Sequence, residues 1–371
     1  MLGAALAVEF ADELVDGVKS ATLPAIQHSL GIGYAQLGLL GAVPLLAGGL
    51  LELPAGLVRN RRAGILGGGV LFVLALASVA FAQNFAELLV ALTLFFPASG
   101  FFVTLTQASL MEGEPDRQAQ LMARWDAVGW TGAVAGPLLV IAVLAAGGSW
   151  RTAYLAVAAV AAVAWVGLRK TGTQKPDEQH TRRTRPRDIL AGARTAWRWL
   201  LLLEVANLLV DVLSGFVAVY LVDVAHTTTV FAGVVVAIRL GAGLAGDALL
   251  IAALRRFSDL AVLRATAVAA ALLYPAFLLA PELPVKIVVI TLLSAATATW
   301  YPLLQARLYG AVPSPVAVTL STATGMAAAA GPLAVGVAAG AFGLPWALGG
   351  LAVVPIVLLI VIRRAAVKPP E

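Results

Sequence analysis

The sequence has little of the chemistry that soluble enzymes use. It contains no cysteine and only three histidines, and 12% of its residues are charged. The lack of cysteine excludes a disulfide framework and a thiolate metal site. HExxH, GxSxG and a phosphate-binding loop are also missing, so the sequence does not indicate an enzyme. Gly241, Gly243 and Gly246 match a dinucleotide-loop spacing, but inside an apolar segment we expect them to allow close helix packing instead.

Apolar residues are abundant instead. They make up 60% of the 371 residues, against about 45–50% in an average soluble domain. Such a composition is typical of a membrane protein. The N-terminus has no basic region ahead of its apolar run, and acidic residues follow, so we expect no signal peptide.

The apolar segments fall into two groups of six, separated by a polar connector. The sequence therefore predicts an all-α polytopic membrane protein with 12 transmembrane helices in two bundles, 1–168 and 197–371, joined by a cytoplasmic linker at 169–196. The predicted spans are 2–27, 34–58, 63–83, 85–110, 119–147, 150–168, 197–222, 228–254, 258–280, 284–308, 315–342 and 345–363.

Basic residues are concentrated on one side of these predicted spans. The turns of the other side hold only Arg151 and Lys286. The positive-inside rule therefore places both termini in the cytoplasm. We expect the membrane to be a bacterial or archaeal inner membrane. The net charge of +5 reflects this asymmetry between the two sides of the membrane. We therefore expect anionic lipid, and not nucleic acid, as a partner. We also expect the protein to be a monomer.

The first predicted span carries a stripe of carboxylates. On a helix, Glu9, Asp12, Glu13 and Asp16 fall within an arc of roughly 100° and about 10 Å of axis. Apolar residues occupy the other side. A charge at mid-membrane costs at least about 2.5–3.5 kcal/mol on insertion scales, so these groups should face a cavity or a partner.

The stripe is repeated in the second half of the chain. Residues 204–211 follow the pattern of residues 9–16, with Glu204, Asn207 and Asp211 at the places of three first-half acids, and Leu208 in place of Glu13. The match indicates an internal duplication. Because asparagine cannot titrate, the two halves differ in charge.

These carboxylates have two interpretations. They bind protons or a cationic substrate, or they form a structural network with Lys19, Arg239 or Arg264. Glu13 is either an additional proton site or a partner of Lys19. Arg239 lies mid-span, and we expect it to pair with Asp211 or a first-span acid, with binding of an anionic substrate as the alternative.

Other candidate residues lie along the later spans and near the span ends. Trp300 and Tyr301 have two interpretations: they line a substrate cavity, or they take part in ordinary packing between helices. We expect Arg264 and Lys286 to extend toward the membrane surface. Four charged residues are candidate gate groups, with ordinary helix-end charge as the alternative: Glu52, Asp247, Arg61 and Arg256.

With its two groups of six predicted spans and a basic connector between them, the chain resembles the major facilitator superfamily over essentially its whole length. The residues Gly132–Pro137 look like the glycine-proline motif most familiar in its drug:proton antiporters, and Trp150–Tyr154 resembles the usual opening of the sixth span. Residues 56–62 look like the loop between spans two and three, although Asn60 stands where the family has aspartate. The fourth span lacks the arginine common in the antiporters.

The resemblance implies a secondary transporter that works by alternating access between two parallel repeats. Our first hypothesis is a proton-coupled exporter of a small cationic or amphipathic compound, with no cofactor beyond the proton gradient. A second is a transporter of a divalent metal held by Asp12, Asp16 and Asp211. A third is a lipid-handling member of the family.

Overall fold

The structure is a computed structural model that describes residues 2–52, 61–113, 118–170, 186–313, 316–317, 319–320, 326 and 328–365. Within these ranges the chain is helical and contains no strand. The family-like loop at 56–62 lies outside the described residues except for its last two arginines. The predicted all-helical class is confirmed.

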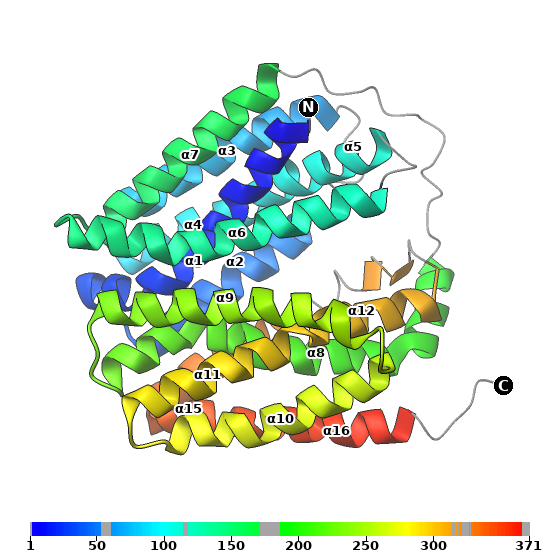
Figure 1. Ribbon diagram of the computed structural model, residues 1–371. Coiled ribbons are helices and arrows are strands. Elements are labelled where there is room, and N and C mark those ends of the chain that lie inside the picture. The colour runs from blue at the N-terminus through cyan, green and yellow to red at the C-terminus, as the bar shows by residue number, and fades with distance from the viewer. Residues whose placement is uncertain are drawn as a thin grey trace. The chain divides into compact units, whose positions relative to one another are not determined.

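The first compact unit comprises residues 1–181 and 226–237. The helix bounds follow the predicted spans closely (Figure 1). The helices of this half of the sequence are α1 (Leu2–Leu30), α2 (Tyr34–Glu52), α3 (Arg61–Phe81), α4 (Phe85–Ser99), the π-helical segment η2 (Gly100–Thr104), α5 (Leu105–Gly113), α6 (Gln118–Ala145) and α7 (Trp150–Lys170).

The second compact unit comprises residues 182–225 and 238–371. Helix α9 therefore contributes its first residues to the first unit and the remainder to the second. The described helices of this half of the sequence are α8 (Pro186–Asp223), α9 (Thr229–Ala253), α10 (Asp259–Leu279), α11 (Leu283–Ala298), α12 (Trp300–Ala311), α14 (Ala330–Phe342), α15 (Leu344–Gly349), the short 3₁₀ turn η4 (Gly350–Ala352) and α16 (Val353–Ala365).

Ten of the described helical stretches are long and apolar enough to cross a membrane. Helix α1, with 29 residues, is also long enough, but its charged residues lower its hydropathy. Helix α14 is shorter and lies in the predicted eleventh span. Each predicted span thus corresponds to at least one helix within the described residues.

The predicted linker is helical at both ends. Helix α7 continues to Lys170, and α8 begins at Pro186, about three turns before the predicted start of the seventh span. Proline suits the first turn of a helix, and Asp188 in that turn interacts favourably with the helix dipole. The remainder of the linker lies outside the described residues.

Glycines bring α1 and α6 into backbone contact. A Cβ placed on Gly17 would lie 2.2 Å from the carbonyl oxygen of Ala133, and one on Gly136 would lie 2.6 Å from the backbone of Gly17. A Cβ on Gly132 would lie 2.6 Å from the carbonyl oxygen of Phe10. No larger residue fits these places, so the glycine-proline motif of α6 fixes the approach of the acidic helix.

Lys286 differs from its prediction. Its side chain is 8% exposed, so it does not extend to the membrane surface. Its Nζ donates to the Tyr220 hydroxyl (3.0 Å) and to the carbonyl oxygens of Phe277 (2.9 Å) and Leu278 (3.1 Å) at the end of α10. The last carbonyls of a helix attract a cation, which explains the burial. The prediction that Lys286 snorkels is wrong.

Candidate functional site

The acidic stripe of α1 is graded in exposure. Glu9 is 7% exposed, whereas Asp12 and Glu13 are half-buried and Asp16 is exposed. The Glu9 side chain packs against α6. A Cβ on Gly129 of α6 would lie 2.6 Å from Glu9 Oε1, so the glycine leaves room for this carboxyl group.

Helix α6 adds a fifth acid, Asp126, which the sequence pattern did not reveal. The carboxyl groups of Asp126, Asp12 and Glu13 all lie close enough to Glu9 to interact with it electrostatically, and the Trp125 side chain lies within hydrogen-bonding reach of Glu9. Asp126 precedes Gly129 by three residues and so shares its face of the helix. The three-residue spacing between Asp126 and Gly129 was the feature of the sequence that could have indicated this acid.

Helix α4 supplies a hydroxyl group to the same cluster. Ser99 Oγ donates to Asp12 Oδ1 at 2.7 Å. Ser99 is the last residue of α4, and the π-helical segment η2 begins at the next residue. Such π-helical insertions occur frequently at functional sites, because they reposition side chains along an otherwise regular helix. We name Glu9, Asp12, Glu13, Asp126 and Ser99 the acidic cluster.

The nearby lysine does not neutralise the cluster through Glu13. Lys19 Nζ lies 5.1 Å from the centroid of the Phe96 ring, a cation–π contact. Glu13 and Lys19, both described, form no ion pair within 4.0 Å. In this structure Lys19 therefore does not hold Glu13 in an ion pair, and the role of Glu13 as an additional proton site stays a prediction. Closely spaced carboxyl groups of this kind can exchange protons or hold a cation.

The second unit contains the equivalent stretch of α8. Glu204 and Asn207 are half-buried and Asp211 is exposed. Arg239 of α9 is 6% exposed; its Nη2 donates to Ser214 Oγ at 2.6 Å, and Asp211 lies within electrostatic range. The predicted association of Arg239 with Asp211 is thus electrostatic, and Ser214 is an additional partner that the sequence did not reveal.

The two aromatic candidates lie in different surroundings. Trp300 is 1% exposed, and its Nε1 donates to Thr266 Oγ1 at 3.1 Å, which fits the packing interpretation. Tyr301 is 53% exposed. Their assignment to a substrate site stays a prediction.

The candidate gate residues are dispersed among the helix ends. Arg61 is the first residue of α3 and is half-buried, Asp247 is half-buried in α9, and Arg256 is exposed in the turn after α9. Glu52 ends α2, but its side chain lies outside what the structure describes. Their gating role stays a prediction.

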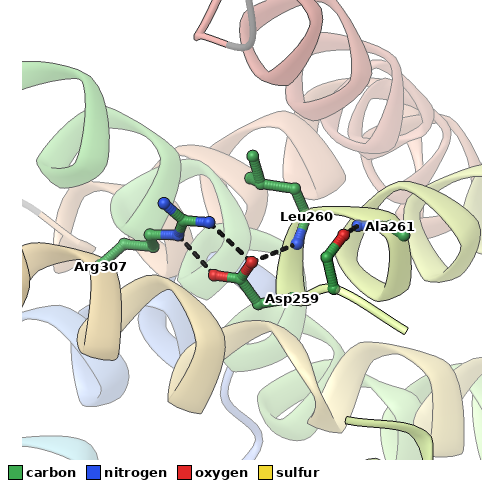
Figure 2. A network of polar contacts seen from close by, with 5 residues as sticks. Asp259, Leu260, Ala261 and Arg307 are labelled. Carbon is green, nitrogen blue, oxygen red and sulfur yellow. Dashed lines mark hydrogen bonds and ion pairs between the residues drawn. The ribbon is translucent and has the colours of Figure 1, made fainter. Parts of the chain in front are cut away.

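A different ion pair joins α10 to α12, and the sequence analysis missed it. Arg307 Nε and Nη2 donate to Asp259 Oδ2 (2.5 Å) and Oδ1 (2.6 Å), as Figure 2 shows. The Arg307 guanidinium also lies 5.6 Å from the Trp199 ring of α8. Asp259 is placed by the N-cap Ser258, whose Oγ accepts from the Ala261 N–H at 3.3 Å. The pair thus ties the start of α10 to two other helices.

Within the described part of the chain, no three His, Cys, Asp or Glu side chains converge in a way that could hold a metal ion. The negative charge of the acidic cluster would attract a cation, but its carboxyl groups are not arranged as the ligands of a metal ion. Intramembrane charged groups in a bundle of apolar helices are characteristic of transport proteins.

Comparison with known proteins gives the family. The model of the Major Facilitator Superfamily matches residues 6–322. The chain belongs to this superfamily, and the predicted fold is confirmed. A comparison with curated proteins finds no match.

Solved structures of this fold cover nearly the whole chain. A bacterial homologue of the human lysosomal transporter Spinster is 16% identical, with 98% of this chain and 96% of that chain covered and a TM-score of 0.80. A mutant of the nucleoside transporter NupG is 12% identical, with 98% and 100% covered and a TM-score of 0.80. A D-xylose–proton symporter is 15% identical, with 96% of each covered and a TM-score of 0.74. At these identities the likeness shows the fold alone.

Proposed function

We propose that this protein is a proton-coupled secondary active transporter that exports a small cationic or amphipathic compound by alternating access. The observation that carries the proposal is the burial of Glu9 among Asp12, Glu13 and Asp126. A carboxyl group is costly inside a membrane protein unless it binds a proton or a cation, and here its nearest charged neighbours are also acidic.

The acidic cluster would couple the two fluxes by competition. When protons occupy the carboxyl groups, the cluster loses the negative charge that attracts a cation. When the protons leave, the cationic substrate takes their place. Rocking of two six-helix bundles would expose the cluster to one side of the membrane at a time. Asp16, which is exposed, would present a further carboxylate of the stripe, and the exposed Asp211 is the corresponding candidate in the second unit.

The direction and the setting of transport are part of the same proposal. The glycine-proline motif, which places α1 against α6 through Gly17 and Gly136, supports export because it resembles that of drug:proton antiporters. We propose that the protein works as a monomer in the cytoplasmic membrane with both termini inside. It would need no cofactor other than the proton gradient.

Transport by purified protein in liposomes tests the proposal. Under an imposed proton gradient, wild-type protein should move radiolabelled tetraethylammonium against its concentration gradient. Glu9→Gln should reduce this proton-driven transport at least about tenfold, the equivalent of about 1.4 kcal/mol. Glu282→Gln is the matched control, because Glu282 is exposed and makes no side-chain cap at the start of α11. Proton-driven transport by Glu9→Gln at the wild-type rate would refute the coupling role.

A further inference from the structure

Arg239 is a buried cation whose hydrogen-bonding capacity is only partly used. Its side chain is 6% exposed, and its one described hydrogen bond runs from Nη2 to Ser214 Oγ. The Nε and Nη1 atoms are buried without a hydrogen-bond partner in the described part of the chain. Leaving such donors unpaired costs about 1–3 kcal/mol per group, and more when the group is charged.

The unused donors have the geometry of an oxyanion receptor. Nε carries one N–H and Nη1 carries two, in the fixed plane of the guanidinium group. Carboxylate and phosphate oxygens match this arrangement and make stronger hydrogen bonds than neutral acceptors. Ser214 holds Nη2 at 2.6 Å, which fixes the orientation of the plane before a ligand arrives.

The surroundings supply a competing anion. Asp211 precedes Ser214 by three residues on α8, so both side chains point to the same face of that helix. Asp211 interacts electrostatically with Arg239 and is itself exposed. An incoming oxyanion would therefore replace part of an existing interaction instead of meeting a bare charge.

The depth of Arg239 argues against a lipid headgroup as the oxyanion. Arg239 lies ten residues after the start of α9 at Thr229, which corresponds to about 15 Å of helix. The hydrocarbon core of a bilayer is about 30 Å thick, so this distance reaches its middle. A headgroup at the membrane surface would not reach that depth.

We propose that Arg239 and Ser214 form an oxyanion subsite, and that the transported compound carries a carboxylate or a similar group in addition to its cationic group. The inference rests on the proposed function and narrows its substrate class to zwitterionic compounds. Arg239 would bind the anionic group. Asp211 would partly balance the charge of the guanidinium group when substrate is absent.

Matched pairs of compounds test the subsite by equilibrium binding to the purified full chain. Phenylalanine and phenethylamine share a ring and an ammonium group and differ in the carboxylate; betaine and tetramethylammonium form a second pair. For at least one pair, wild-type protein should bind the carboxylate member about tenfold more tightly, as one charge-assisted hydrogen bond predicts. Arg239→Met should abolish this preference, and the exposed Arg194→Met on α8 should retain it.

A variant that gains affinity keeps the test independent of folding defects. Asp211→Asn removes the competing anion, so it should raise the affinity for the carboxylate member several-fold relative to the affinity for the pair member that lacks a carboxylate. Absence of a carboxylate preference in both pairs, or its persistence in Arg239→Met, would overturn the subsite. A preference that disappears when phosphatidylglycerol is added would assign the site to a lipid headgroup and overturn the substrate assignment.

The proposed function can be separated from this subsite. Glu9→Gln should lose proton-driven transport but keep the carboxylate preference in binding. Arg239→Met should lose the preference while Glu9 still couples proton movement to tetraethylammonium, which has no carboxylate. Loss of coupling in wild type with a retained preference would refute the coupling role alone.

Discussion

Ser99 donates a hydrogen bond of 2.7 Å to Asp12 at the point where α4 gives way to a π-helical turn. The bond joins two residues 87 positions apart, and it connects α4 to the acidic helix α1. The serine therefore sets the orientation of one carboxyl group in a cluster that also draws on α6.

Removal of the Ser99 hydroxyl should impair transport without unfolding the protein. Hydrogen bonds to charged groups contribute about 1.5–3 kcal/mol, so Ser99→Ala should lower the rate of proton-driven tetraethylammonium transport by about tenfold or more. Ser78→Ala on α3 is the control, because its exposed hydroxyl bonds only to a carbonyl of its own helix. Unchanged transport by Ser99→Ala would show that this bond does not serve the site.

Two glycine substitutions should separate stability from function. Gly17→Ala places a Cβ 2.2 Å from a backbone oxygen, so it should lower the melting temperature in detergent, with a free-energy cost of about 1–3 kcal/mol. Gly129→Ala meets the end of the Glu9 side chain, which can move aside, so it should fold normally but lose proton-driven transport. Gly67→Ala, with nothing within 4 Å, is the control for both. Normal transport by Gly129→Ala would contradict the placement of Glu9.

The ion pair between Asp259 and Arg307 should contribute modestly to stability. Both side chains are partly exposed, at 34% and 37%, which limits the strength of the pair. A double-mutant cycle with Asp259→Asn and Arg307→Met should give a coupling free energy of about 1 kcal/mol from thermal unfolding in detergent. The same cycle on Glu282 and Arg307 should give none. A coupling near zero for the first pair would mean that the bidentate contact contributes nothing.

Loss of the buried lysine should be far more damaging. Lys286→Met leaves the Tyr220 hydroxyl and the carbonyl oxygens of Phe277 and Leu278 without their donor. We expect a destabilisation of at least about 2 kcal/mol, visible as a lower melting temperature or reduced accumulation in the membrane. Arg194→Met, which removes an exposed charge, should leave both unchanged. A melting temperature of Lys286→Met equal to that of wild type would refute this account of the lysine.

The sequence predicted the fold well because hydropathy acts locally. An apolar run of sufficient length must be helical in a membrane, so the spans and most of their ends followed from the sequence alone. Helix α8 begins before the predicted seventh span, because a polar segment gives no such constraint on where a helix starts. The acids of α1 were also evident, since charge in an apolar run stands out whatever it contacts.

The partners of those acids could not be predicted in the same way. Asp126, Ser99 and Ser214 lie far along the chain from the residues they contact, and their helix faces are set by packing. Lys286 was misplaced because a lysine near a predicted span end normally reaches the surface, whereas here the end of α10 supplies carbonyl acceptors. Such contacts depend on tertiary structure, which periodicity does not encode.

The most direct test of the account is proton release on substrate binding. Tetraethylammonium added to purified protein in weakly buffered detergent solution should displace protons from the acidic cluster, detected with a pH-sensitive dye. Wild type and Glu282→Gln should release protons, and Glu9→Gln should release markedly fewer. Equal release by Glu9→Gln and wild type would contradict the claim that the cation and the proton compete for this cluster.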